Sequence, residues 1–244
     1  RDDVESRGLG DVYKRQALYK TNLEAGVDYM EMGYRASKKV FDETKFGKWK
    51  FCSDDHIREI VGENDTDLKL AIMADIGRHD KNDFDEKVNS PVDMVRVAAY
   101  IHQMPEAIDM IEDAHKKGYE TTCNIMAISQ TQESDLKVAL DMLGKTPVDT
   151  IYIVDSFGSI YPEEMKRIVD IYMEAATKYG KQLGVHAHNN QQLAFANTIE
   201  AAARGVSLLD CTIMGMGRGA GNCATELLLS FLTVSYTHLR AHET

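Results

Sequence analysis

Short apolar runs alternate with amphipathic stretches along most of this sequence, and this alternation constrains the fold more than any other feature. The runs that we interpret as strands are Val27–Tyr34, Leu68–Ala74, Met94–Ala99, Glu120–Ile128, Thr150–Asp155, Leu183–His188 and Leu208–Ile213. A helical pattern or a helix-length loop follows each of them, which is typical of parallel βαβ units. Seven units predict an α/β fold, a (β/α)₈ TIM barrel that is truncated, with the first strand missing. A doubly wound sheet is the alternative, but the sequence has no dinucleotide-binding fingerprint.

The two ends of the sequence do not follow this pattern. One stretch of DNA, read from opposite strands, can encode both Ser6 to Gln16 and Val234 to Thr244, as a sequencing-library adapter would. We therefore expect residues 1–16 and residues 234–244 to be adapter artefacts. Residues 17–233 would then be a partial TIM-barrel catalytic domain, and the histidines in the tail would not be ligands.

Charge and cysteine content exclude several classes of partner. The formal net charge is −11, from 39 acidic and 28 basic residues, which argues against binding to nucleic acid or to an anionic membrane. No apolar run has the roughly 18 residues that a membrane span needs, and no secretion signal is visible. The four cysteines lack CxxC spacing, which favours buried thiols in a reducing compartment. We predict a cytoplasmic protein.

His186 and His188 stand at the carboxyl end of a predicted strand, where barrels carry their catalytic groups. Two residues apart, their imidazoles share one face of the strand, about 6.6 Å apart along the backbone. Neutral imidazole is a common ligand of transition metals. Two ordinary histidines would be the default interpretation of such a short motif, but the strand-end position favours a metal site.

A glycine-rich loop, residues 215–222 with the sequence GMGRGAGN, follows the last predicted strand. Glycines let a backbone approach a ligand closely, and amides at the start of a following helix attract anions. A tight strand–helix connection would also explain the pattern. Beside the two histidines, we expect Gly217 and Gly219 to contact the substrate and Asn222 to offer an amide oxygen to a metal.

Polar residues also stand at the ends of other predicted strands. We expect Glu31, Asp155 and Ser156 to bind the substrate, whereas Asp75 and Asn124 are more simply explained as barrel residues satisfied by their neighbours. No lysine lies in the carboxyl-terminal half of a predicted strand, so that a Schiff-base mechanism is disfavoured. A metal that acts as a Lewis acid on a 2-oxo acid is preferred.

These motifs carry a family resemblance. The block from Leu183 to Leu229, with HAHNN and GMGRGAGN, closely resembles the HMG-CoA lyase-like TIM-barrel superfamily of metal-dependent pyruvate aldolases with a pyruvate carboxyltransferase-type domain. YMEMGY at Tyr29 to Tyr34 and IVDSFGSI at Ile153 to Ile160 are similar to its 4-hydroxy-2-oxovalerate aldolase branch. The likeness spans most of residues 17–233.

The resemblance implies a site and a reaction. His186 and His188 would be ligands of Mn²⁺ or Mg²⁺, and Asn222 falls where some relatives place a further ligand. The resemblance assigns the general base, an arginine and a carboxylate ligand to an Arg-Asp motif on the missing first strand, for which Arg1-Asp2 is no substitute. The catalytic residues are therefore unknown, and we expect the fragment itself to be inactive.

The expected activity is cleavage or formation of a carbon–carbon bond next to a 2-oxo acid, with release of pyruvate and an aldehyde. An acyl-CoA-dependent Claisen-condensing synthase of the isopropylmalate or homocitrate type is the enzymatic alternative, and a non-catalytic barrel is the other. The expected partners are a small-molecule 2-oxo acid and, by resemblance, an aldehyde dehydrogenase or a second copy of the chain.

Overall fold

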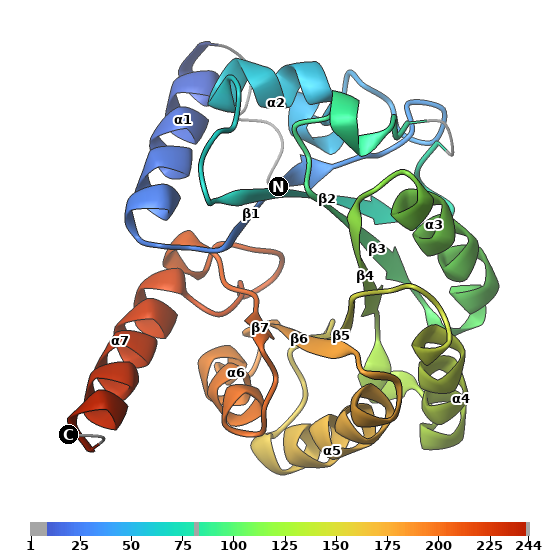
Figure 1. The fold of residues 1–244 in the computed structure, drawn as a ribbon, viewed down its shortest axis with the longest axis vertical. Helices are drawn as coiled ribbons and strands as arrows, with labels where there is room; N and C mark the ends of the chain where they lie inside the picture. Colours follow the sequence, from blue (N-terminus) through green and yellow to red (C-terminus); the bar gives the residue numbers. More distant parts are fainter. Residues whose placement is uncertain (1–8, 81–82, 243–244) are drawn as a thin grey trace. The chain divides into compact units, whose positions relative to one another are not determined.

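The computed structural model describes residues 9–80 and 83–242, which fall into two compact units. The first unit comprises the described parts of residues 1–124 together with residues 146–149, and the second comprises residues 125–145 and 150–244 as far as described. Figure 1 shows helices alternating with strands along the chain within both units.

The first unit contains three complete strands and most of a fourth. Its elements are α1 (Leu9–Glu24), β1 (Tyr29–Tyr34), α2 (Asp54–Val61), β2 (Lys69–Asp75), β3 (Met94–Ala99), α3 (Met104–Lys116) and β4 (Glu120–Ile125), with short 3-10 turns at Lys48–Lys50, Lys87–Asn89 and Ile101–Gln103. The strands β1, β2 and β3 pair in parallel. Every residue of β3 is buried, as expected of a parallel strand that is covered on both faces.

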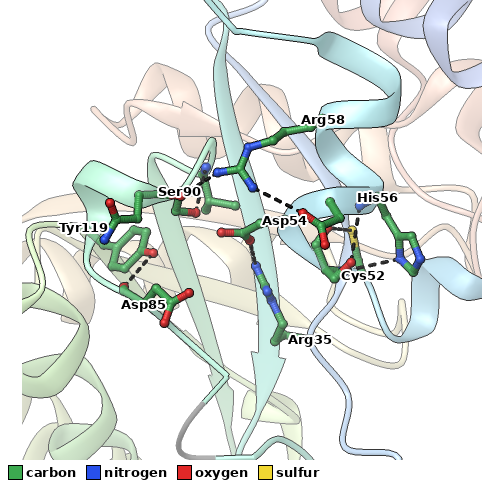
Figure 2. Close-up of polar contacts among 12 residues, drawn as sticks. Arg35, Cys52, Asp54, His56, Arg58, Asp85, Ser90 and Tyr119 are labelled. Atoms are coloured by element: carbon green, nitrogen blue, oxygen red, sulfur yellow. Dashed lines mark hydrogen bonds and ion pairs between the residues drawn. The ribbon is translucent and has the colours of Figure 1, made fainter.

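Helix α2 begins one residue earlier than its local pattern predicts, since a cap at Asp54 would start the helix at Asp55. We expected Asp54 to cap this helix, but Ser53 is the N-cap, and its side-chain oxygen accepts a hydrogen bond from the backbone N–H of His56 at 3.3 Å. Asp54 is instead the first helical residue and forms an ion pair with Arg35 at 2.5 Å (Figure 2). Both side chains are largely buried, so the pair ties the helix to the chain segment that follows β1.

The second unit continues the same alternation. Its elements are α4 (Glu133–Gly144), β5 (Thr150–Asp155), α5 (Pro162–Tyr179), β6 (Gln182–Ala187), α6 (Ala194–Ala203), β7 (Leu208–Leu209) and α7 (Thr225–His242), with 3-10 turns at Ile128–Gln130 and Ile213–Gly215. β5, β6 and β7 are neighbours in that order and pair in parallel, so β6 lies in the middle (Figure 1). The α/β class with parallel strands is confirmed in both units.

β6 ends at Ala187 rather than His188, and two other strands end well before their predicted ends. β4 stops at Ile125 rather than Ile128, because Ala127 adopts a left-handed backbone with φ 55° that no strand can contain. The last strand covers only Leu208–Leu209 instead of reaching Ile213, since β6 pairs with it at just two positions. The residues from Asp210 onward are therefore free to form a loop beyond the strand.

The predicted adapter segments fall partly within described structure. Residues 9–16 lie in α1 and residues 234–242 lie in α7, whereas residues 1–8, including Arg1 and Asp2, and residues 243–244 lie outside the described part. The assignment of both ends to an adapter remains a prediction. None of the helices in the described ranges combines the length and the apolar character that crossing a bilayer requires.

Candidate metal and substrate site

The end of β6 holds the two predicted imidazoles. Leu183, Val185 and Ala187 are buried, and strand alternation turns His186 and His188 toward the opposite face. The centroids of the two rings lie 5.0 Å apart, with an angle of 78° between the ring planes. The structure thus brings the two histidines together.

Asp210 orients His186. The Nδ1 atom of His186 lies 2.9 Å from Oδ2 of Asp210, and the backbone N–H of Asp210 donates to the carbonyl of Val185 at 3.0 Å. A carboxylate beside Nδ1 holds the proton on that nitrogen and leaves Nε2 available to a ligand. Asp210 was not predicted as a site residue, although an acid near the end of the strand next to the histidine pair is a signal that the sequence contains.

His188 is electrostatically disposed to stay neutral. Burial lowers the pKa of His188 to about 4, and the positive charges of a protonated His186 and of Arg218 act in the same direction. Hydrogen bonds with the backbone of Gly221 and Arg218 oppose this shift but are weaker. At neutral pH the ring therefore carries no charge, which is the form that binds a cation.

Asn222 lies against His188 through an isolated backbone bridge between the two residues. Its side chain is held by a hydrogen bond from Nδ2 to the carbonyl of Met216 at 3.4 Å, and only 9% of the residue is exposed. Within the described residues, its Oδ1 atom is buried and accepts no hydrogen bond. A buried carbonyl oxygen without a donor is costly unless a ligand or cation satisfies it.

The glycines of the loop make this arrangement possible. A Cβ at Gly217 would stand 2.6 Å from the side-chain nitrogen of Asn222, and a Cβ at Gly221 would stand 2.1 Å from the carbonyl oxygen of Gly215. Gly219, with φ +68°, lies against the side chain of Asn190. The loop is therefore folded tightly around Asn222, and substrate contacts of Gly217 and Gly219 remain a prediction.

In the turn after β5, the side chains of Asp155 and Ser156 form hydrogen bonds with backbone N–H groups of the protein. Asp155 is 1% exposed, and its carboxylate accepts hydrogen bonds from the backbone N–H groups of Ser159 and Ile160 at 3.1 and 3.2 Å. Burial raises the pKa of Asp155, and these hydrogen bonds oppose the rise. The Ser156 hydroxyl accepts from the N–H of Ala127 at 2.9 Å. Both residues thus shape the loop beside His188, and substrate binding by them remains a prediction.

Glu31, Asp75 and Asn124 belong to the first unit or its boundary. Glu31 on β1 pairs with Arg96 on β3 at 2.8 Å, so it is engaged in an ion pair. Burial raises the pKa of Asp75, and its Oδ2 atom lies 3.5 Å from Nη1 of Arg78. Asn124 accepts a hydrogen bond from the Thr122 hydroxyl at 2.7 Å, as expected of a barrel residue satisfied by its neighbours.

The donors brought together by β6 and the loop after β7 are two imidazoles and one amide oxygen. Among the described residues, no group of three or more His, Cys, Asp or Glu side chains is placed to hold a metal ion. His186, His188 and Asn222 nonetheless fit a divalent cation, because one ring is oriented, the other is neutral and the amide oxygen lacks a donor.

Comparison with known proteins places this chain in a family. The HMGL-like family model matches residues 11–242. The chain is 33% identical over 141 residues to an oxaloacetate decarboxylase of Mycobacterium tuberculosis, covering 58% of this chain and 41% of that protein. It is 24% identical over 217 residues to a 4-hydroxy-2-oxovalerate aldolase of Bacillus cereus, covering 89% and 62%. The chain thus spans only about half the length of these relatives.

The fold is shared with a solved enzyme structure. Hydroxymethylglutaryl-CoA lyase from Pseudomonas aeruginosa superposes with a TM-score of 0.75 over 96% of this chain and 82% of that one, at 17% identity. At that identity the likeness shows the fold alone, and it agrees with the truncated TIM barrel predicted from the sequence. The family match, which extends over nearly the whole chain, shows that this protein belongs to the HMGL-like family.

Proposed function

We propose that this chain carries the metal site of a divalent-metal-dependent carbon–carbon lyase, which releases pyruvate from a 2-oxo acid. The preferred reaction is the aldol cleavage of a 4-hydroxy-2-oxo acid into pyruvate and an aldehyde, with Mn²⁺ or Mg²⁺ as the cofactor. The observation that carries the proposal is the buried Oδ1 of Asn222, which has no donor among the described residues, on a residue whose backbone forms a bridge with that of His188. Relatives named as an aldolase and as a decarboxylase support the same class.

In this proposal His186, His188 and Asn222 hold the metal, which would supply Lewis acidity toward the carbonyl and carboxylate of the 2-oxo acid. Asp210 keeps His186 in the tautomer that presents Nε2. Burial keeps His188 unprotonated near neutral pH, so a nitrogen lone pair of its ring stays available to a metal. The folded glycine loop holds the amide of Asn222 in place.

A decarboxylase is the second candidate, favoured by the 33% identity to an oxaloacetate decarboxylase. Aldol cleavage breaks the bond between the third and fourth carbons of a 4-hydroxy-2-oxo acid, and decarboxylation breaks the corresponding bond of oxaloacetate. In both cases the electron pair stays with the third carbon, which is then protonated, and pyruvate is released. The two candidates therefore share one product and differ in the other, an aldehyde or carbon dioxide.

One assay tests the proposal. Because the chain spans only part of the length of its relatives, the complete gene product is used. Pyruvate release from 4-hydroxy-2-oxovalerate and from oxaloacetate is measured with Mn²⁺ and with a chelator, for wild type and for His186→Ala. Chelator-sensitive pyruvate that His186→Ala loses would support the proposal. Turnover of neither substrate, or release that ignores both the chelator and the substitution, would contradict it.

A further inference from the structure

Arg218, in the middle of the glycine loop, has no charged partner. Its side chain is exposed, and within the described residues no carboxylate lies within ion-pair distance of its guanidinium. Two further surface arginines in the described part of this unit, Arg167 and Arg204, are each paired with an acid. A free guanidinium is unexpected on a chain with a net charge of −11, where acidic side chains are plentiful.

Arg218 is nevertheless fixed in place. Its Nη2 donates a hydrogen bond to the carbonyl of Ser156 at 3.1 Å. Arg218 lies in the loop after β7, and Ser156 lies in the turn after β5. Since β6 is the strand between β5 and β7, a side chain that joins these two loops passes across the end of β6, where the histidine pair stands.

The Arg218 guanidinium keeps donors available for a ligand. Of its five N–H donors, the Ser156 carbonyl engages those of a single nitrogen. The remaining edge can face a planar anion such as a carboxylate, which the guanidinium fork binds with two parallel hydrogen bonds.

The residues of the site differ in their exposure to solvent. Asn222 is 9% exposed and His188 is half-buried, whereas Arg218 is exposed at the rim. A 2-oxo acid whose carbonyl end is directed at the buried donors therefore has its far end directed at the rim. An anionic group there would meet Arg218, and it would otherwise enter a field that the net charge of −11 makes unfavourable.

We propose that Arg218 forms an anion subsite that selects 2-oxo acids with a second carboxylate at the end distant from the carbonyl. This inference deepens the proposed function and rests on it, because it takes the carbonyl end of the substrate to lie at His186, His188 and Asn222. Arg218 is then a specificity-determining residue. It takes no part in the bond cleavage itself.

The test compares two probes that cannot be cleaved. 2-Oxoglutarate and 2-oxopentanoate both have five carbons. The last carbon is a carboxylate in 2-oxoglutarate and a methyl group in 2-oxopentanoate. Their binding to the complete gene product with Mn²⁺ is measured by calorimetry for wild type, Arg218→Gln, Arg218→Lys and Arg204→Gln. Arg204 is the matched control, since its guanidinium is paired with Asp170 and Glu200 on the helical surface.

Wild type should bind 2-oxoglutarate about ten- to a hundredfold more tightly than 2-oxopentanoate, as expected for hydrogen bonds between charged groups. Arg218→Gln should remove this preference, Arg218→Lys should keep part of it, and Arg204→Gln should keep all of it. Equal affinity of wild type for both probes, a preference that survives in Arg218→Gln, or binding of neither probe would overturn the subsite.

Turnover separates this inference from the proposed function. Pyruvate release from 4-hydroxy-2-oxovalerate, which has a methyl end, is measured for wild type and for Arg218→Gln, and the substitution should lower it far less than it lowers the affinity for 2-oxoglutarate. If that turnover is present and the probes show no Arg218-dependent preference, the lyase stands and the subsite fails. If Arg218→Gln abolishes turnover of the methyl-ended substrate as well, Arg218 serves the reaction in general, and the specificity role is wrong.

Discussion

Asp210 acts on the candidate site through His186. It lies 2.9 Å from Nδ1 and thereby determines which nitrogen of the ring can bind a cation. We expect Asp210→Asn to weaken Mn²⁺ affinity about 10- to 100-fold while the fold is retained, which is typical when the partner of a ligating histidine is changed. Calorimetric titration with Mn²⁺ measures the loss. Asp170→Asn removes an exposed carboxylate of the same unit and should leave the affinity unchanged. Equal affinities for both variants would refute the orienting role.

Asp75 is a buried carboxyl group whose pKa is raised from 3.8 by burial, in spite of the positive charges of Lys50, Arg78 and His79. A raised folded-state pKa means that its favourable contribution to stability is complete below 3.8 and is lost as the pH rises through the folded value. Asp75→Asn should therefore make the protein more stable than wild type at pH 7, and the difference should shrink as the pH falls toward 3.8.

Urea unfolding of both proteins at pH 7 and at pH 4.5 measures this difference. Asp80 is the matched control, because hydrogen bonds from Lys39 and Ser37 lower the pKa of its carboxyl group. Asp80→Asn should bring no gain at pH 7. A stability gain of Asp75→Asn that is independent of pH would show that burial of the charge is not its cause.

Close approach of backbone atoms defines the conformation of the glycine loop. Gly221 has φ +93°, and a Cβ there would stand 2.1 Å from the carbonyl oxygen of Gly215. Gly180, the C-cap of α5, has φ +67° but open space around its missing Cβ. Gly180→Ala therefore bears only the cost of a left-handed backbone, about 1–2 kcal/mol, whereas Gly221→Ala must also displace the loop.

We expect Gly221→Ala to lower the free energy of unfolding by clearly more than Gly180→Ala, and to abolish Mn²⁺ binding through the displacement of Asn222. Chemical denaturation and metal titration of the two variants provide the comparison. If the two substitutions cost the same and Mn²⁺ affinity is retained, the tight loop is not what holds Asn222 in place.

The elements themselves could largely be predicted, because local sequence patterns determine most of their boundaries. Every residue of β3 and β5 is buried, and α5 begins at Pro162 and ends before Gly180, the usual positions of proline and glycine at helix ends. Where tertiary pairing sets the boundary, prediction was wrong. β7 ends after Leu209 because β6 offers it only two partners. The N-cap of α2 is Ser53 rather than Asp54, although both residue types can cap a helix.

The candidate site was predictable in part for the same reason. The spacing of His186 and His188 places both rings on one face of a strand, which sequence alone reveals. The ion-pair geometry of Asp210, the missing donor of Asn222 and the reach of Arg218 to Ser156 join residues from different loops. Such contacts depend on the order of the strands in space, and no local pattern encodes them.

A bound cation would connect two segments of the second unit that are distant in the chain. His186 and His188 follow from β6, and Asn222 closes the loop after β7, so the bound state links both loops of the second unit. A ligand that binds only the folded protein stabilises it, by about 2.7 kcal/mol at a free concentration about 100 times Kd. Mn²⁺ should therefore raise the thermal midpoint of wild type.

The effect should also be local. Hydrogen exchange of residues 188–192 and 215–222 should slow when Mn²⁺ is added, whereas α2 in the first unit should exchange at an unchanged rate under conditions of local opening. His188→Ala should abolish both the thermal shift and the protection. His115→Ala, which removes an exposed imidazole from α3, should preserve them. A thermal shift that persists in His188→Ala but disappears in His115→Ala would place the cation away from β6, and the second unit would then not be the metal-binding half of the chain.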